Sequence, residues 1–225
     1  MPTNRKLIFA NGEYYHVFNR GVERRPTFTN KREYSRAVET IDFYKTKNPP
    51  VRFSKFLVLD KEKQVEVRKI ISSGKKLVKV ISYCLMSNHF HFLLQQIHDN
   101  GISKFIANVE NSYTKYFNLK NNRVGHLFQG PFKAVRVESS EQLLHLSRYI
   151  HLNPVSAFLL NKEDLENYQW SSYMEYLRID NKQITDNSII LDFFSNIQKY
   201  KEFVIDYVDY SKKIESIRHL ILEDD

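Results

Sequence analysis

Two histidines one residue apart are the most chemically suggestive feature of the sequence. They lie in the segment HFHFLL, which begins at His89 and includes His91. A β-strand sends alternate side chains to opposite faces, so both imidazoles would share one face, about 7 Å apart along the strand. At that distance they could bind one metal ion, although two surface histidines without a common ligand give the same pattern. The single cysteine, Cys84, argues against a closed structural zinc site, because no second thiolate is available.

A tyrosine and an asparagine four residues apart form a second candidate pair. Tyr149 and Asn153 occur in the segment RYIHLNP, and residues at this spacing share one face of a helix. The phenol could act as a nucleophile and the amide oxygen as a third metal ligand. The chain has 14 tyrosines, of which Tyr113 and Tyr116 are alternative nucleophiles, and Tyr149 could instead be a core residue. Pro154 disfavours helical torsions at the preceding residue, so we expect the helix to end there.

Hydrophobic periodicity indicates which elements must position these residues. It predicts strands at 13–19, 77–86, 89–96 and 132–137, and helices at 31–47, 103–119 and about 140–152. Segment 51–76 fits either a strand or a short basic helix or hairpin. The order of elements matches the split βαβ plan. We therefore predict an α+β, ferredoxin-like (RRM-like) antiparallel sheet with helices on one face, plus a helical C-terminal extension.

Charge divides the chain into two parts. Residues 1–159 contain 26 Lys+Arg and 12 Asp+Glu, a net charge of +14, whereas residues 160–225 contain 8 and 14, a net charge of −6. This division indicates a body (1–159) that binds a polyanion such as nucleic acid and an acidic, mainly helical extension (160–225). An ordinary basic surface with an acidic tail gives the same totals.

The composition indicates the class of protein and its compartment. The apolar fraction of 42% and the aromatic fraction of 14% argue against disorder. The sequence lacks an apolar run of 18 residues, which predicts no membrane partner. One cysteine suits a reducing compartment. We expect a cytoplasmic protein, which nucleic-acid binding by the basic body would make nucleoid-associated.

Five sequence blocks, taken in order, resemble the REP-associated tyrosine transposases, a group of single-tyrosine HUH transposases of insertion-sequence type. The blocks are YYHVFNRGVERRPTF, ISYCLMSNHFHFLL, SYTKYFNLKNNRVGHLFQGPFKAV, LSRYIHLNPVSAFLL and YQWSSYMEYL. They span roughly residues 12–178. The chain departs from its relatives at Pro131, where they commonly have arginine.

The resemblance implies a specific activity. Such enzymes cut and rejoin single-stranded DNA next to small hairpins, so the chain is expected to be a metal-dependent endonuclease and strand transferase that forms a 5′-phosphotyrosine intermediate. By matching motif, Tyr149 would be the nucleophile, His89 and His91 the metal-binding pair, and Asn153 a further metal ligand. The cofactor would be Mg²⁺ or Mn²⁺, held in the catalytic domain 1–159 of a monomer or homodimer.

Side chains for DNA binding are expected after the first strand and on the last strand. The cations that could neutralise phosphates are Arg20, Arg24, Arg25, Lys133 and Arg136. Two aromatic residues of the first strand, Tyr15 and Phe18, could stack on unpaired bases, although aromatics in strands are more often core residues.

Two other functions fit the same sequence. A non-catalytic single-stranded nucleic-acid-binding module on an RRM-like sheet would use the basic body without cleaving DNA. A metal hydrolase would use an activated water in place of Tyr149. His145, one turn before Tyr149, is a weak candidate for a general base. The C-terminal extension carries no recognisable motif, so its removal after about residue 180 is expected to leave cleavage intact.

Overall fold

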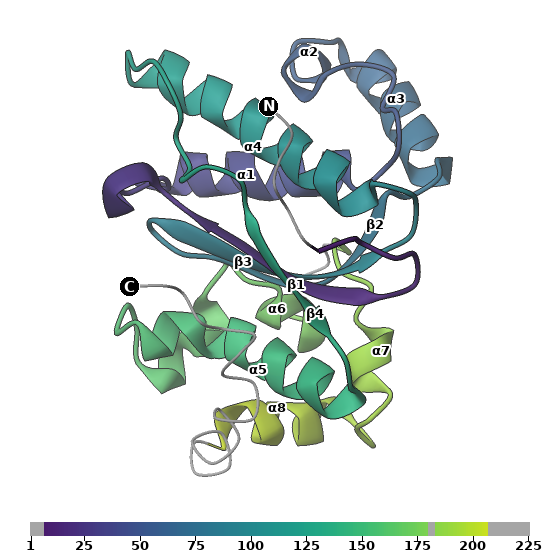
Figure 1. Ribbon diagram of the computed structural model, residues 1–225, viewed down its shortest axis with the longest axis vertical. Coiled ribbons are helices and arrows are strands. Elements are labelled where there is room, and N and C mark those ends of the chain that lie inside the picture. The colour runs from purple at the N-terminus through teal and green to yellow at the C-terminus, as the bar shows by residue number, and fades with distance from the viewer. Residues whose placement is uncertain (1–6, 180–182, 207–225) are drawn as a thin grey trace.

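A four-stranded antiparallel sheet forms the centre of the computed structural model, which describes residues 7–179 and 183–206. The strands are β1 (Tyr14–Arg20), β2 (Val78–Leu85), β3 (His89–Gln96) and β4 (Lys133–Val137). Their order across the sheet is β2-β3-β1-β4 (Figure 1). One helical connection joins β1 to β2 and another joins β3 to β4. The predicted ferredoxin-like fold class is therefore confirmed.

Helices α1 (Lys31–Tyr44) and α4 (Gly101–Lys120) cover one face of this sheet (Figure 1). The side chain of Asn30 caps α1 by accepting a hydrogen bond from the backbone N–H of Glu33 (3.2 Å). Apolar residues of both helices pack against Val17, Phe90 and other residues that alternate along β1 and β3. This first core accounts for the strong apolar periodicity of both helical segments.

The segment between α1 and β2, which the sequence left ambiguous, is helical. It forms α2 (Phe53–Phe56) and α3 (Lys61–Ser73). Phe53 and Phe56 lie three residues apart on one helical turn, and both are buried against Phe43. In a strand, side chains three residues apart would point to opposite faces, so this aromatic contact favours the helix.

The opposite face of the sheet is covered as well. Its main element is α5 (Ser140–Ser156), which packs on β2 and β3. Three shorter helices follow: α6 (Tyr173–Tyr176), α7 (Ser188–Leu191) and α8 (Ile197–Ile205). Two 3₁₀ turns, Val22–Arg24 and Lys162–Asn167, complete the described elements. The sheet is thus the middle of three layers (Figure 1).

Helix α5 does not end at the predicted position. It continues through Pro154 to Ser156, so the predicted end near Leu152 is wrong. A proline removes only its own N–H bond, and the helix closes with a hydrogen bond from Ala157 N to the carbonyl of Asn153 (2.9 Å). Leu152 and Pro154 are both buried, which stabilises the last turn.

The second core, between the sheet and α5, includes residues from both sides of the predicted boundary at residue 159. Ile81, Leu93 and Ile150 pack there with Tyr173 and Tyr200 of the extension. The division into domains 1–159 and 160–225 stays a prediction. The extension was predicted to be mainly helical; its last described helix, α8, ends at Ile205, and residues 207–225 lie outside the described residues.

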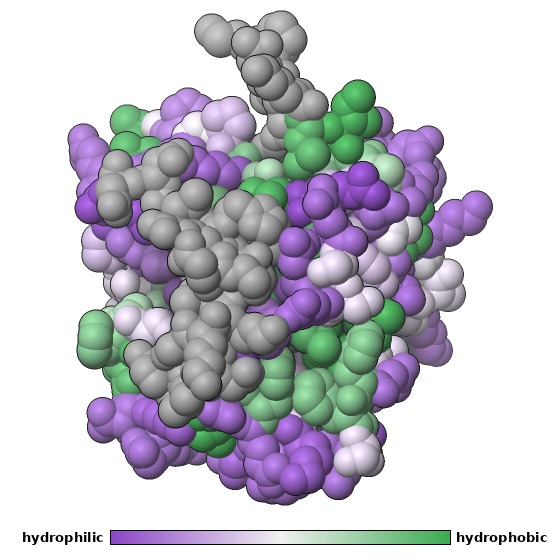
Figure 2. Space-filling view, turned by 60° about the horizontal axis from the view of Figure 1, so that its bottom comes forward, coloured by the Kyte–Doolittle hydropathy of each residue, from purple (hydrophilic) through white to green (hydrophobic). Residues whose placement is uncertain are grey.

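The surface on the side of α5 and α8 is mixed in character. Its described part is largely hydrophilic, with hydrophobic residues gathered in several areas (Figure 2). Exposed hydrophobic side chains of this region include Phe158 and Phe193. No helix in the described part of the chain is both long and apolar enough to cross a membrane.

Candidate functional site

The histidine pair lies on the face of β3 that is directed toward α5. Phe90 and Phe92 alternate with the histidines and pack into the first core on the other face. The rings of His89 and His91 are 5.0 Å apart between centroids and nearly perpendicular. His91 is fully buried, whereas His89 remains partly exposed. The strand period therefore places both imidazoles where the sequence predicts.

Helix α5 brings Tyr149 and Asn153 to these histidines. Ser139 caps the helix by accepting a hydrogen bond from the N–H of Gln142 (3.1 Å). The Tyr149 ring meets the His91 ring edge-on, with centroids 5.6 Å apart. Asn153 is buried and forms a side-chain hydrogen bond with His89. All of these side chains belong to one chain, so the cluster forms within a single subunit.

A third histidine, His16 of β1, completes the cluster. Its Nε2 lies 3.0 Å from Nδ1 of His91, and the two rings stack with centroids 5.2 Å apart. The Tyr149 ring is 6.2 Å from the His16 ring. Sequence reasoning missed this residue. The alternation in EYYHVFN places His16 and Phe18 on one face, but only the pairing of β1 with β3 shows that this face carries His91.

Burial keeps the imidazoles of the pair neutral. It lowers the pKa of His89 to about 4, and the charge of Arg20 acts in the same direction, opposed by the hydrogen bond with Asn153. Burial likewise lowers the pKa of His91 well below its ordinary value, with further contributions from His89, His16 and Arg20. A metal ligand must offer a ring nitrogen that carries no proton, so these environments suit coordination.

The Nδ1 atoms of both histidines have polar neighbours. Nδ1 of His89 lies 2.6 Å from Oδ1 of Asn88, and Nδ1 of His91 lies against His16. When each Nδ1–H donates in these contacts, the lone pair is on Nε2. Outer contacts of this kind fix the tautomer and orientation of metal-binding histidines.

The donor set is compatible with Mn²⁺ or Mg²⁺. It comprises two imidazoles and the amide of Asn153, and imidazole and carbonyl oxygen both suit Mn²⁺. The described residues contain no group of three or more His, Cys, Asp or Glu arranged to hold a metal. A cation between His89 and His91 would therefore depend on Asn153 and on oxygen ligands from phosphate or water.

Only two of the five predicted DNA-binding cations lie on the same face of the sheet as the histidines. Arg20 lies opposite His89 in the β1–β3 pairing, and Lys133 lies opposite Phe18, whose ring contacts His91. Side chains of directly paired residues share a face, so both cations lie on the face that carries His89 and His91.

The other three cations lie elsewhere or are paired. Arg24 is exposed in the 3₁₀ turn after β1. Arg25 forms an ion pair with Glu23 (2.6 Å). Arg136 lies opposite Tyr15, on the face of the first core, and forms an ion pair with Glu13 (2.9 Å).

Several other sequence candidates lie away from the histidines or are buried. The alternative nucleophiles Tyr113 and Tyr116 belong to α4, on the opposite face of the sheet, where Tyr113 donates a hydrogen bond to the carbonyl of Thr27 (2.6 Å). Tyr15 and Phe18, the predicted base-stacking residues, are only 1% and 6% exposed, so they are core residues.

The weak candidate base, His145, also has another role. Its Nδ1 accepts a hydrogen bond from the buried Arg148 (2.9 Å), and its ring contacts Phe203 of α8. These contacts tie His145 to the C-terminal region of the fold.

The structure thus joins a ferredoxin-like sheet, a strand with two histidines and a helix that carries Tyr149. Residues 53–153, which include both histidines, Tyr149 and Asn153, match the family model described as "Transposase IS200 like". Among curated proteins, none matches the sequence significantly.

The fold is similar to a solved structure described as a REP-associated tyrosine transposase bound to a REP hairpin. The TM-score is 0.50 at 13% identity, covering 83% of this chain and 94% of that one. Residues 53–153 are thus similar to the IS200-like transposases, and the fold of the chain is similar to that of a REP-associated tyrosine transposase.

Proposed function

We propose that the protein is a metal-dependent single-stranded DNA endonuclease and strand transferase that uses Tyr149 as its nucleophile. The observation that carries this proposal is the contact of the Tyr149 ring with His91 on one side of β3, beside the hydrogen-bonded pair of His89 and Asn153. A transposase family implies DNA as substrate, and the net charge of +14 on residues 1–159 suits a polyanion.

The reaction is a transesterification. The Tyr149 oxygen attacks the scissile phosphorus and loses its proton, while the bond between phosphorus and the 3′ oxygen breaks. The products are a 5′-phosphotyrosine and a 3′ hydroxyl, which takes up a proton. Attack by a 3′ hydroxyl on the phosphotyrosine reverses the step, so rejoining needs no nucleotide cofactor.

Each residue of the cluster has a separate task. His89, His91 and Asn153 would hold the cation, which when bound polarises the scissile phosphate and stabilises charge on the leaving oxygen. His16 orients the His91 ring. Arg20, next to His89 in the paired strands, neutralises phosphate charge close to the site of attack.

We propose hairpin-bearing single-stranded DNA as the partner, by similarity to the hairpin-bound structure. Because one chain supplies Tyr149 and both histidines, the site acts in cis, and either a monomer or a homodimer of such complete sites would serve. Cytoplasmic, nucleoid-associated localisation follows from a DNA substrate.

The coverage of the sheet argues against the non-catalytic alternative. RRM modules stack bases on an open sheet face. Here α1 and α4 cover one face, and α5 covers the other, with His91 fully buried. Bases therefore have no open aromatic platform on this sheet.

The decisive experiment follows covalent adduct formation. A hairpin-bearing oligonucleotide labelled at its 3′ end is incubated with protein and Mn²⁺ or Mg²⁺ and resolved under denaturing conditions. Wild type should carry the label as a protein adduct, Tyr149→Phe should not, and the control Tyr113→Phe should keep the adduct. Equal adduct from wild type and Tyr149→Phe, or none from either, would show that the assignment of Tyr149 is wrong.

The same assay separates the two alternatives. Cleavage without an adduct that persists in Tyr149→Phe would identify a hydrolase with a water nucleophile. Binding without cleavage, unchanged by chelator and by the His89→Ala/His91→Ala double variant, would identify a non-catalytic binding module.

A further inference from the structure

A groove of about 760 Å³ lies on the side of the molecule remote from Tyr149. Helix α1, the segment 49–54 and helix α4 form its walls. Its volume falls within the range of ligand-binding pockets, about 300–1,000 Å³. The cationic side chains that line it are Arg36, Arg52 and Lys115.

The described residues that line the groove include no carboxylate. Its remaining polar lining consists of serines, asparagines and tyrosines, among them Asn108, Asn111 and Ser112 along α4. The carboxylates of Glu39 and Asp42 on α1 line a separate cavity. Three cations with hydroxyl and amide donors form a surface complementary to phosphate oxygens.

Arg36 lines this groove and is partly buried. Its guanidinium lies 4.3 Å from the centroid of the Phe53 ring and 5.2 Å from that of Tyr116. Its Nε and the hydroxyl of Tyr116 are buried and have no hydrogen-bond partner among the described residues. Buried donors without partners are costly, so an incoming acceptor would be favoured. Arg52 and Lys115 are exposed at the rim.

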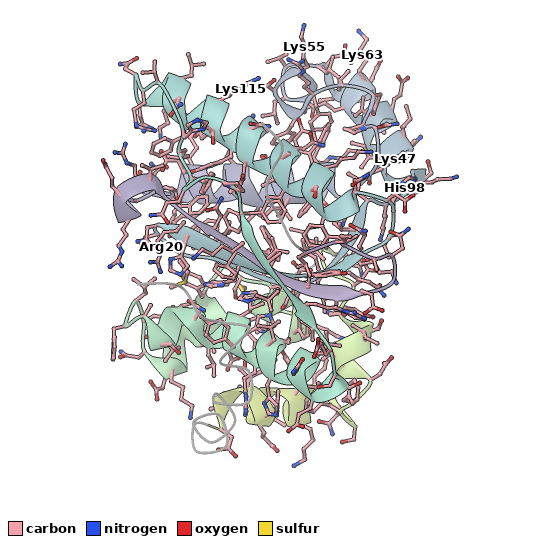
Figure 3. The ribbon with its side chains drawn as sticks, in the orientation of Figure 1. Arg20, Lys47, Lys55, Lys63, His98 and Lys115 are labelled. Atoms are coloured by element: carbon pink, nitrogen blue, oxygen red, sulfur yellow. The ribbon has the colours of Figure 1, made fainter. Side chains whose placement is uncertain are left out.

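The groove is separated from the histidine site by the sheet. It belongs to the α1 and α4 layer, whereas Tyr149 belongs to α5 on the other face. The labelled Lys115 projects from the helical layer at the end of the molecule away from α5 and α8, with Arg20 placed much nearer the sheet (Figure 3).

We propose that this groove is a second nucleic-acid contact site, which binds the sugar-phosphate backbone of single-stranded DNA outside the segment that is cut. Arg36 is recessed and partly buried, so a phosphate must enter the groove to reach it. A single strand can enter in this way, whereas the backbone of a duplex would meet only the rim cations. This site does not require Tyr149 to be a nucleophile.

The first test measures how salt changes the binding of single-stranded DNA to a groove variant and to a control variant outside the groove. Arg52→Ala/Lys115→Ala removes two rim cations, and Lys61→Ala/Lys69→Ala removes two exposed cations of α3 outside the lining. Binding of a fluorescent single strand is measured with chelator present and with the Tyr149→Phe background, so that no cleavage occurs. The charge-matched control separates a local site from general electrostatic attraction.

In the groove variant, the slope of log affinity against log salt concentration should be smaller in magnitude by about 1.4. Each lost phosphate contact with a single strand accounts for roughly 0.7 of this change. That change corresponds to a roughly sevenfold smaller loss of affinity between about 50 and 200 mM salt. The control should keep the wild-type slope. Equal slopes and affinities for the two double variants would overturn the proposal.

A second measurement locates the strand directly. The only cysteine, Cys84, is fully buried, so Lys115→Cys or Lys69→Cys can be labelled selectively with a thiol-linked photocrosslinker. Irradiation should join single-stranded DNA to the label at position 115 and much less to that at 69. Equal crosslinking from both positions would contradict the groove, whatever the outcome of the adduct assay for Tyr149.

Discussion

His16 contacts His91 through a buried ring-to-ring hydrogen bond, and this contact has a consequence for metal binding. Its Nε2 lies 3.0 Å from Nδ1 of His91, so it can accept a hydrogen bond from the Nδ1–H of His91 and thereby leave Nε2 of His91 without a proton. Without that acceptor, the His91 ring loses both its tautomer and its orientation. Partners of metal ligands commonly contribute 10- to 100-fold to metal affinity.

Substitution at His16 tests this role. We expect His16→Phe, which removes the acceptor, to lower Mn²⁺ affinity by about 10- to 100-fold, as for other outer-shell partners. His16→Gln offers an amide oxygen to His91 and should lose less. Electron paramagnetic resonance titration of free Mn²⁺ measures affinity without any DNA. Wild-type Mn²⁺ affinity in His16→Phe, with the fold intact by circular dichroism, would contradict the positioning role.

Helix α5 is held on two sides, which makes it a rigid support for Tyr149. Toward the sheet it presents Tyr149 and Asn153, and on its other side Arg148 donates a hydrogen bond to the carbonyl of Phe203 (3.0 Å). His151 lies 2.7 Å from the hydroxyl of Tyr200 and 2.7 Å from that of Ser172. These contacts join α5 to α8 and to the start of α6.

Two Tyr→Phe variants of this second core should differ in stability. Tyr200→Phe leaves Nδ1 of the buried His151 without its partner, so unfolding free energy should fall by about 1–3 kcal/mol. Tyr173→Phe is the matched control, because its buried hydroxyl has no hydrogen-bond partner among the described residues, and its removal should be close to neutral. Urea unfolding of both variants measures the difference. Equal midpoints would show that the bond to His151 contributes little.

At the scale of the whole molecule, the C-terminal region is part of the fold. Ile184, Ile190, Tyr200 and Val204 are each no more than 4% exposed. The last three belong to the second core, together with the apolar residues of α5. The sequence led us to expect that residues after about 180 can be removed without loss of cleavage. This packing leads us to expect instead that their removal disrupts the fold.

Truncation after residue 180 is therefore expected to destabilise the protein severely. Burial of each large apolar side chain contributes about 1.5–3 kcal/mol, so four of them contribute roughly 6–12 kcal/mol. Typical domains have only about 5–15 kcal/mol of net stability. Near-ultraviolet circular dichroism and thermal unfolding should show loss of fixed tertiary structure relative to the full chain. A truncated protein that unfolds cooperatively at the full-length midpoint would contradict this expectation.

Local pattern in the sequence was sufficient for the four strands, for most of α1, α4 and α5, and for the two pairs of site residues on shared faces. The strand period places His89 and His91 on one face, the helix period places Tyr149 and Asn153 on one face, and Asn30 and Ser139 cap helices as their residue types predict. Such features depend on neighbours within a few residues, and those neighbours are visible in the sequence.

Tertiary structure alone decided which of these faces meet. The contact between His16 and His91 spans 75 residues, and it exists because β1 is paired with β3 at one particular register. Tyr149 and not Tyr113 lies beside His91 because α5 and α4 pack on opposite faces of the sheet. These outcomes depend on how buried surfaces of distant segments fit together, and no local periodicity encodes that fit.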